Sequence, residues 1–440
     1  MAQLAAKISK SNKNISTREE LETLDKQSLV DRIVQLEAHN FQLKRIIKKA
    51  ENSAARNFRK NETQTANGEK RFDFSLSSTR HVFLKFFYLG WNYHGFVEQE
   101  DNNNTVEEHI FNALKKSCCI ESRQSSNYHR CGRTDKGVSA FSQVISLDVR
   151  SRFVPDEQKQ VEKELEYCKI LNRLLPRDIK CIAWSPAGNS QSARFDCKRR
   201  MYKYYFPRGN LNISAMNEAA QHIVGHHDFR NFCKMDVGNG VLRFDRTVSE
   251  ARVVSRVTPD EREPAEKPSG YDMCHFVIKS QAFLWHQIRC IMGILLLVGQ
   301  EKEEPQVVAE LLDVDSCPRK PQYNLAHELP LNLYDCSFDD VNWIYDQNEL
   351  VDIVKSLEQD WTFDAIKSTM MRDMLDDLKI HLDGSVVSTF GNTSPLLQGV
   401  QSKVYQPVMK RLTCESLENR IKHYEKKRKI QVKDDDEDCP

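Results

Sequence analysis

The sequence predicts an α+β fold in which two similar halves share one sheet. Aromatic and β-branched runs recur between residues 81 and 280, and helical patterns lie between them. With 440 residues, 40% of them hydrophobic and 29% charged, the chain is long enough to bury a large core. We expect no membrane segment, because the longest apolar patch, Ile291 to Val298, is too short to span a bilayer. The first residues do not resemble a secretion signal.

The first compact elements are expected in the order strand, helix, strand. Residues 81–90 form an aromatic and β-branched run that predicts a buried strand. A helix is expected from Thr105 to about Cys118, because Thr105 and Glu108 have the spacing of a capping box. A second strand is expected at 143–149, where polar and apolar residues alternate.

The remaining elements continue this alternation. Pro155 is expected to begin a charged helix that runs to Leu175. The further strands are expected at 179–184, 201–206, 248–257 and 275–280, and an apolar helix at 285–298. After Asp340 the pattern becomes helical and acidic through Leu382, and 383–398 is rich in Gly, Ser and Thr.

Composition divides the chain into six parts. They are a helical leader at 1–50, a flexible basic linker at 51–80, a first core half at 81–207, a second core half at 208–340, a helical extension with a loop at 341–425, and a charged disordered tail at 426–440.

The leader contains a short coiled-coil pattern. Apolar residues and one Asn alternate by four and three at Leu29, Ile33, Leu36, Asn40, Leu43 and Ile47. Two interpretations stay open: a dimerisation or partner helix whose register Asn40 fixes, or an amphipathic helix packed on its own protein.

The cysteines and histidines predict no metal site. The 13 cysteines are scattered, and the close pair Cys118 and Cys119 is adjacent rather than spaced as metal ligands are. His226, His227 and Asp228 resemble ligands, but adjacent histidines point apart, which favours a structural or RNA-facing loop. Unpaired thiols indicate a reducing compartment. With a net charge of +1, any nucleic acid must be held by local basic patches.

The densest chemical signal is the run RCGRTDKGVSA at 130–140. Gly132 and Gly137 permit a tight loop from which Asp135 could project into a cleft. Arg133, two residues away, would help to keep this carboxylate ionised as a nucleophile or base. The alternative is an ordinary turn in which Asp135 binds its own backbone.

A second cluster, at 194–208, interleaves cations with aromatic rings. Arg199, Arg200 and Lys203 could hold phosphates, while Tyr202 could stack on a base of a single-stranded or flipped nucleotide. The alternative is a strand with its tyrosines facing inward and its lysines outward, and both interpretations can hold together.

A third segment, 283–293, places Arg289 on an otherwise apolar helix. A buried guanidinium needs a carboxylate partner. We expect Asp135 to be this partner, in a bidentate bridge between the two halves. The alternative is that Arg289 lies on the outer face of the helix.

Together, these segments resemble the TruA family of tRNA pseudouridine synthases, whose RTDxGV motif is present as RTDKGV. The similarity covers about residues 81 to 340 and includes LNRLLPRDI, SARF, RMYKY, HDFRNF and QAFLWHQIRCIMG in family order. Ser139, HDFRNFCKMD and KPQYNLAHELPLNLYDC resemble the eukaryotic branch, which modifies uridines 38 and 39 of the anticodon stem-loop. The resemblance implies the pseudouridine synthase fold, in which two ferredoxin-like catalytic halves share a central, mostly antiparallel sheet.

The resemblance also implies roles for single residues. Asp135 would be the nucleophile, Tyr202 the ring stacked on the target uracil, Arg289 the ion-pair partner of Asp135, and Arg133 the side chain that replaces the flipped base. The partner would be a tRNA anticodon stem-loop, and the enzyme a homodimer. Moving the glycosidic bond from N1 to C5 needs no redox change, so no cofactor is expected. Attack at C6 or at C1′ stays open.

Rival functions also stay open. They are a non-catalytic RNA-binding protein with this fold, the same reaction on another RNA, and an adaptor acting through residues 20 to 50. The basic run KKRK at 426–429 would be a nuclear signal, an RNA contact or part of a solvated tail. We expect the protein in the nucleus and cytoplasm.

Overall fold

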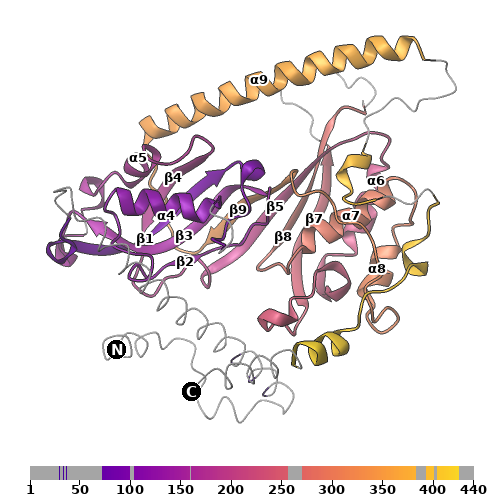
Figure 1. Cartoon of the computed structure of the whole chain (residues 1–440), viewed down its shortest axis with the longest axis horizontal. Coiled ribbons are helices and arrows are strands. Elements are labelled where there is room, and N and C mark those ends of the chain that lie inside the picture. The colour runs from indigo at the N-terminus through magenta and orange to yellow at the C-terminus, as the bar shows by residue number, and fades with distance from the viewer. Residues whose placement is uncertain are drawn as a thin grey trace, which may run out of the picture.

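A computed structural model describes residues 72–99, 104–158, 160–255, 270–382, 393–400 and 404–425, together with Leu29, Ile33 and Leu36. Within these residues a sheet of nine strands passes through both lobes of the molecule (Figure 1). Its strands lie in the order β4-β1-β3-β9-β5-β8-β7-β6, and β2 pairs with β3 beside this path. All neighbouring strands are antiparallel except β3 and β9. The α+β prediction with a mostly antiparallel sheet is confirmed.

The strands are β1 (Ser78–Tyr88), β2 (His129–Arg130), β3 (Ser139–Ser151), β4 (Ile179–Pro186), β5 (Cys197–Pro207), β6 (Gly225–Asp228), β7 (Asp245–Ser255), β8 (Met273–Ser280) and β9 (Leu331–Phe338). The helices of six residues or more are α4 (Val106–Lys116), α5 (Tyr167–Asn172), α6 (Ile213–Gln221), α7 (Gln287–Gly299), α8 (Val307–Leu312) and α9 (Gln347–Ile380).

The two halves of the sheet repeat one topology. The strands of the first half lie in the order β4-β1-β3-β2, and those of the second in the order β9-β5-β8-β7. Counted along the chain, both halves read fourth, first, third, second, with a helix after the first strand and another after the third. This is the ferredoxin-like βαββαβ arrangement. Because β5 begins the second half, the division expected after residue 207 places this strand in the wrong half.

Strand β9 joins the halves. It pairs in parallel with β3 at Ser139 and Ala140 and runs antiparallel to β5. Farther along β3, Ile145 and Ser146 pair with β2. Since β1 occupies the other edge of β3, β2 and β9 share one edge. The loop between β2 and β3 therefore leaves the sheet at a fork between the two halves.

Helix α7 forms the centre of the second half. Every residue from Gln287 to Gly299 is buried. A helix that is apolar on nearly all sides is stable only when protein surrounds it, and α7 packs against α6. The expected helix at 285–298 agrees with these bounds to within two residues.

Two local predictions in the first half are wrong. Thr105 is the N-cap residue of α4, but its side chain makes no capping hydrogen bond, so the capping box does not form. Pro155 begins a 3-10 turn rather than a long helix, and the segment contains a second such turn at Val161–Lys163 before the short helix α5. Its Glu164 side chain is buried and accepts hydrogen bonds from Arg80 and Ser151 instead of covering a helix face.

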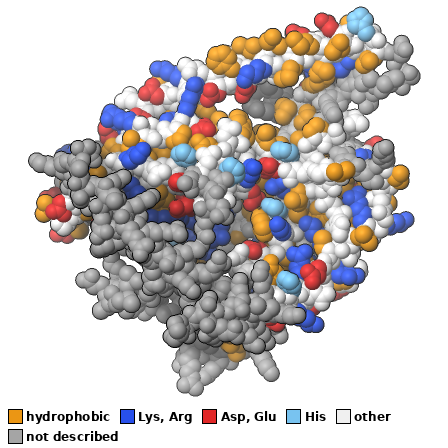
Figure 2. Space-filling view, viewed as in Figure 1, with side chains coloured by type: hydrophobic (Ala, Val, Ile, Leu, Met, Phe, Trp, Pro, Cys, Tyr) orange, Lys and Arg blue, Asp and Glu red, His pale blue; other side chains and the backbone are white. Residues whose placement is uncertain are grey.

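Only part of helix α9 packs against the core. The Asp346 side chain caps its beginning by accepting from the backbone N–H groups of Asn348 and Glu349. Near this end, Ile353 packs against Phe87 of β1 and Ile182 of β4. Farther along, apolar side chains are exposed, and they follow the helix at the top of Figure 2.

Part of the predicted leader can be compared with the structure. Leu29, Ile33 and Leu36 are helical, and Ile33 and Leu36 are exposed. The residues outside the described part include Asn40, Leu43, Ile47, most of the predicted linker, positions 383–392 of the predicted loop at 383–398, and the tail at 426–440. No helix in the described part of the chain combines the length and hydrophobicity that a bilayer span requires.

Candidate active site

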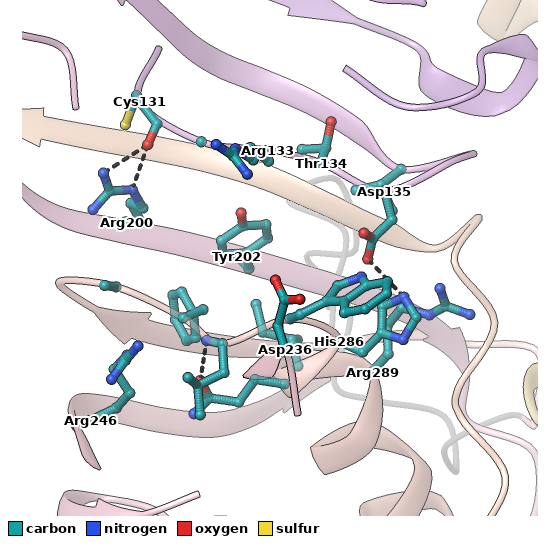
Figure 3. A pocket seen from close by; sticks show the side chains of 18 of the residues that line it. Cys131, Arg133, Thr134, Asp135, Arg200, Tyr202, Asp236, Arg246, His286 and Arg289 are labelled. Atoms are coloured by element: carbon teal, nitrogen blue, oxygen red, sulfur yellow. Dashed lines mark hydrogen bonds and ion pairs between the residues drawn. The ribbon is translucent and has the colours of Figure 1, made fainter. Parts of the chain in front are cut away.

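A cleft of about 760 Å³ opens where the two halves diverge (Figure 3). The loop between β2 and β3 supplies Arg133, Thr134 and Asp135. The second half faces them with side chains from β5, from the segment before β7, from β7 itself, from the segment between β8 and α7, and from α7: Arg200, Tyr202, Lys234, Asp236, Arg246, Phe283, Trp285, His286 and Arg289.

Backbone contacts fix the loop that carries Asp135. The Val138 N–H donates to the Asp135 carbonyl oxygen (3.1 Å), and Gly137 between them has φ +77°. A type II turn requires this positive φ at its third residue. The Thr134 hydroxyl shares a 2.7 Å hydrogen bond with Tyr88, and its carbonyl oxygen accepts from the Phe96 N–H. The tight loop expected between Gly132 and Gly137 is thus present, and it directs the Asp135 side chain into the cleft rather than back onto its own backbone.

The Asp135 carboxylate is partly buried, with 29% of its side chain exposed. Burial raises its pKa above the ordinary value, while the charge of Arg289 and a hydrogen bond with the Trp285 side chain act in the opposite direction. Its side chain faces His286, whose Nε2 lies 3.5 Å from the Asp135 Oδ2. The carboxylate is therefore held at the cleft wall without a strong ion pair.

His286 is a site residue that the sequence analysis missed. Its backbone has φ 60°, a left-handed conformation that is costly for a residue with a side chain. Burial, and then the charges of Arg289, Lys234 and Lys320, lower its pKa to about 4, so the imidazole is neutral at physiological pH. Its position three residues before Arg289, within the segment 283–293, was the available signal.

Arg289 does not form the expected bridge with Asp135. Its Nη2 donates to Glu328 Oε2 (2.9 Å) and to Gln398 Oε1 (2.6 Å), and its Nε donates to the Ala326 carbonyl oxygen. Only 5% of Arg289 is exposed, so it does not lie on an outer face. The prediction that it needs a carboxylate is right, but the partner is Glu328, which the loop before β9 brings to it. Arg289 acts on Asp135 through its charge alone.

Tyr202 lies on β5 at the base of the cleft, and 8% of the residue is exposed. Its ring meets that of Phe283 edge to face, with 5.2 Å between centroids. Figure 3 shows Tyr202 below Arg133 and Asp135 of the loop and above Asp236 and Arg246 of the second half. The predicted pair of Tyr202 and Asp135 therefore does line one cavity.

The three basic residues predicted beside Tyr202 divide between two faces of β5. Arg200 lines the cleft and donates from Nη2 to the Cys131 carbonyl oxygen (2.8 Å). Lys203 instead lies 3.4 Å above the Tyr334 ring, and Arg199 makes a 3.5 Å hydrogen bond to Ser337. Neither Arg199 nor Lys203 lines the cleft. Alternation along the strand separates Lys203 from Tyr202.

A buried carboxylate holds the strand before the loop. Glu107, in the first turn of α4, accepts from Arg130 (2.7 Å), Arg123 (2.8 Å) and the Tyr128 hydroxyl (2.6 Å). Burial raises the Glu107 pKa, but the two arginine charges outweigh it and leave the pKa lowered. The ion pair with Glu107 thus fixes Arg130, three residues before Arg133.

Arg133 and Arg194 are not neutralised in this way. No carboxylate in the described part of the chain lies within ion-pair distance of either guanidinium. Burial and the charges of neighbouring arginines lower the pKa of both. Two rings of the cleft lining are accessible, because Phe195 exposes 59% of its surface and Trp285 exposes 41%. The cleft thus combines two arginines that form no ion pair within the described residues with accessible rings.

Comparison with known proteins agrees with the motifs. Residues 219–339 match a family model described as tRNA pseudouridine synthase. The human tRNA pseudouridine(38/39) synthase is 44% identical over 433 residues, covering 92% of this chain and 89% of the human protein. The chain belongs to the tRNA pseudouridine synthase family.

More distant members also align with this synthase. The Saccharomyces cerevisiae tRNA pseudouridine(38/39) synthase is 38% identical over 84% of this chain and 80% of its own. Methanobrevibacter smithii tRNA pseudouridine synthase A is 30% identical over 67% of this chain and 97% of its own. The TruA-type resemblance is thereby confirmed, and the chain is an enzyme of this family.

The histidine pair of the synthase has structural partners. His226 contacts the Thr247 hydroxyl, His227 contacts the Val224 carbonyl oxygen, and Asp228 pairs with Arg230. These residues form β6 at the edge of the sheet and do not line the cleft.

Proposed function

We propose that the synthase isomerises uridine to pseudouridine at positions 38 and 39 of the tRNA anticodon stem-loop, with Asp135 as the nucleophile. The observation that carries this proposal is the Asp135 carboxylate, directed into a basic cleft that Tyr202 and His286 also line. The human and yeast relatives, whose names specify positions 38 and 39, support the choice of substrate.

The reaction needs a carboxylate that attacks the nucleotide while the base is detached, rotated and rejoined through C5. Burial of Asp135 limits the water that competes with a substrate, and the nearby Arg289 charge favours the ionised carboxylate. The target base must leave its stack to reach Asp135. Tyr202, on the floor of the cleft, lies where its ring can contact the flipped uracil, and Arg133, in the lining of the same cleft, would fill the vacated stack.

Arg133 and Arg194, two arginines of the cleft that form no ion pair within the described residues, support RNA as the substrate. Arg133 and Arg194 line one hollow, and the charge of Arg194 contributes to lowering the pKa of Arg133. A phosphate between them would relieve this repulsion. Phe195 and Trp285 offer rings for unstacked bases, each stack contributing about 1–3 kcal/mol. A non-catalytic RNA-binding role would use the same cations but would not need Asp135.

The decisive assay measures tritium release from an anticodon stem-loop labelled at C5 of uridines 38 and 39, with no cofactor added. Release is expected with the full-length protein and not with Asp135→Ala, while binding of the stem-loop persists. Asp360→Ala, an exposed carboxylate on α9, serves as the matched control. Equal release from wild type and Asp135→Ala would remove the nucleophile assignment. Stem-loops with uridine at other positions test the alternative substrates.

We also infer that the synthase is a homodimer, as the resemblance implies. Exposed apolar side chains on α9 support a second copy as the occupant of this helix: Trp361, Phe363, Ile366, Met370, Met374 and Leu378. Sedimentation equilibrium is expected to give a dimer for wild type and a monomer for Trp361→Glu combined with Met374→Glu. A wild-type monomer would refute the inference, and Lys367→Glu controls for added charge.

The proposed location is the nucleus and the cytoplasm, on the basis of the KKRK run at 426–429. Replacing this run with four alanines is expected to reduce the nuclear fraction of a fluorescent fusion. An unchanged distribution would mean that KKRK is not the signal.

A further inference from the structure

Three buried cysteines meet beside the active site, although they are far apart in the sequence. Cys131 begins the loop that carries Asp135, Cys197 begins β5, and Cys336 lies on β9. Their Sγ atoms all lie within 4.8 Å of one another. The three cysteines therefore connect the catalytic loop of the first half, the first strand of the second half, and the strand that joins the halves.

This cluster is distinct among the described residues. It is the one group of three or more His, Cys, Asp or Glu side chains there whose ligand atoms are this close. Another close pair of thiols, Cys168 and Cys181 with Sγ atoms 3.6 Å apart, gives only two ligands. The three cysteines lie far apart in the sequence and lack the close spacing of typical metal ligands, so no metal site was predicted there, whereas the fold brings these thiols together.

We propose that Cys131, Cys197 and Cys336 bind a Zn²⁺ ion that fastens the catalytic loop to β5 and β9. Zn–S bonds of about 2.3 Å in tetrahedral geometry separate the sulfurs by about 3.8 Å. The three Sγ atoms lie within 4.8 Å, so closure around the ion requires movements of about 1 Å or less. Each thiol loses its proton as its Zn–S bond forms, and thiolates favour soft cations over Mg²⁺.

The surroundings can complete the coordination and balance the charge. Cys131 and Cys197 line the cleft, so a water molecule can reach the fourth position of the ion. Three thiolates and Zn²⁺ carry one net negative charge. Arg200 supplies a positive charge beside them, since its guanidinium binds the Cys131 carbonyl oxygen. The ion and Arg200 would then hold the side chain and the backbone of the same residue.

The inference does not depend on the proposed reaction, because it concerns how the loop is held. Cys131 precedes Arg133 by two residues and Asp135 by four. Zinc binding that fixes Cys131 limits the motion of both side chains and stabilises the junction of the halves. Metal removal should therefore lower the melting temperature as well as the activity.

The first test is the zinc content of full-length protein purified under reducing conditions. One zinc per chain is expected for wild type and for Cys274→Ala, a matched variant of a buried cysteine on β8. Cys336→Ala should lose the zinc and melt at a lower temperature that added zinc no longer raises. Equal zinc content in wild type and Cys336→Ala would overturn the proposal.

A second measurement remains valid if Cys336→Ala does not fold. Cobalt(II) added to metal-free wild type should give thiolate charge-transfer absorption, and X-ray absorption of the zinc protein should show three sulfur ligands. Wild type that takes up neither ion under reducing conditions would refute the site. A disulfide among the three cysteines that survives reduction and is found by mass spectrometry would also refute it.

Discussion

At the scale of single residues, the buried position of Asp135 lowers the stability of the folded protein when this carboxyl group is ionised. Burial raises its pKa, so the folded protein resists the ionised form that the proposed reaction needs. The unfolded chain loses this proton at a lower pH than the folded protein does. As pH rises through this interval the unfolded state binds fewer protons, and the stability of the folded state falls.

Asp135→Asn should therefore be inactive but more stable than wild type near neutral pH. The difference in melting temperature should shrink as pH falls, and disappear below the unfolded pKa of about 3.9, where both states are protonated. Calorimetry between acidic and neutral pH measures it. A variant that is less stable than wild type at pH 7 would show that Asp135 is net favourable in the fold.

His286 is expected to tune Asp135 rather than to react itself. A neutral imidazole can donate from Nε2 to the Asp135 carboxylate, which favours ionisation. His286→Ala should shift the acidic limb of the pH–kcat profile to higher pH and lower kcat about tenfold, equivalent to about 1.4 kcal/mol. A kcat reduced equally at every pH would instead indicate a structural role. His226→Ala, at the sheet edge, is the control.

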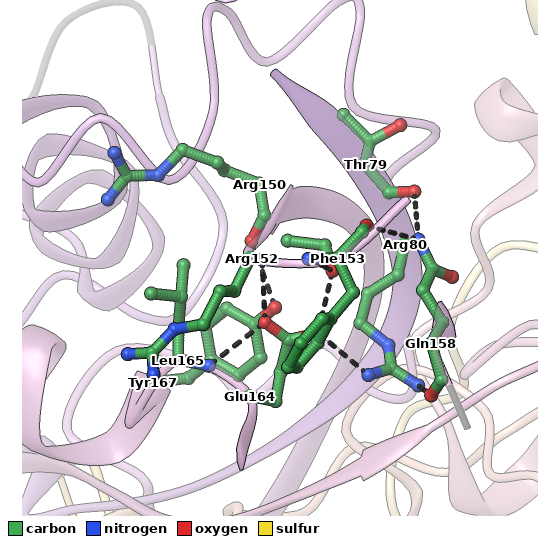
Figure 4. Close-up of polar contacts among 10 residues, drawn as sticks. Thr79, Arg80, Arg150, Arg152, Phe153, Gln158, Glu164, Leu165 and Tyr167 are labelled. Carbon is green, nitrogen blue, oxygen red and sulfur yellow. Dashed lines mark hydrogen bonds and ion pairs between the residues drawn. The ribbon is translucent and has the colours of Figure 1, made fainter. Parts of the chain in front are cut away.

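At the scale of elements, a polar network replaces the helix expected after Pro155. Glu164 is fully buried and accepts from Arg80 (2.8 Å), the Ser151 hydroxyl (2.6 Å) and the backbone N–H groups of Arg152 (2.8 Å) and Leu165 (2.9 Å), as Figure 4 shows. Burial raises its pKa, but these hydrogen bonds, beginning with that of Arg152, leave the pKa lowered. The network ties this segment to β1 and β3.

Glu164→Ala should reduce the free energy of unfolding by about 3–5 kcal/mol, because it leaves the buried Arg80 guanidinium without a carboxylate. The pKa of Glu164 is lower in the folded protein, so its contribution is present above the unfolded pKa and is lost as pH falls through the folded pKa. Urea unfolding measures both effects. Glu166→Ala removes only an exposed pair with Lys169 and should cost at most about 1 kcal/mol. Equal losses would contradict the role of the network.

The sequence predicted some elements better than others for physical reasons. Strand β1 and helix α7 were found because long apolar runs reflect burial on most sides. Strand β9 was missed because its burial alternates with polar residues within a segment rich in Pro and Asn. The helix predicted from Pro155 is wrong because the density of charged residues was taken as a sign of a helix. The Glu164 carboxylate of this segment instead makes tertiary hydrogen bonds.

At the scale of the whole molecule, the site exists only because two halves are joined. Asp135, Arg133, Tyr202 and Arg289 were found through family motifs, and the structure brings all four to one cleft together with His286. The partner of Arg289 could not be predicted, since Glu328 reaches it through a loop whose course depends on β9. The distribution of charge is likewise invisible in the net value of +1.

This distribution makes the salt dependence of RNA binding a test of where the substrate lies. If Arg194 contacts a phosphate, Arg194→Ala should weaken stem-loop binding and reduce the slope of log Kd against log salt by about 0.7–0.9, the value for one phosphate contact. Arg252→Ala, on β7, removes a cation that Glu250 already pairs and that does not line the cleft, so its slope should equal that of wild type. Because both variants lose the same charge from the whole molecule, a long-range effect of net charge would change both slopes alike. Equal slopes for Arg194→Ala and Arg252→Ala would therefore place the RNA backbone away from this cleft.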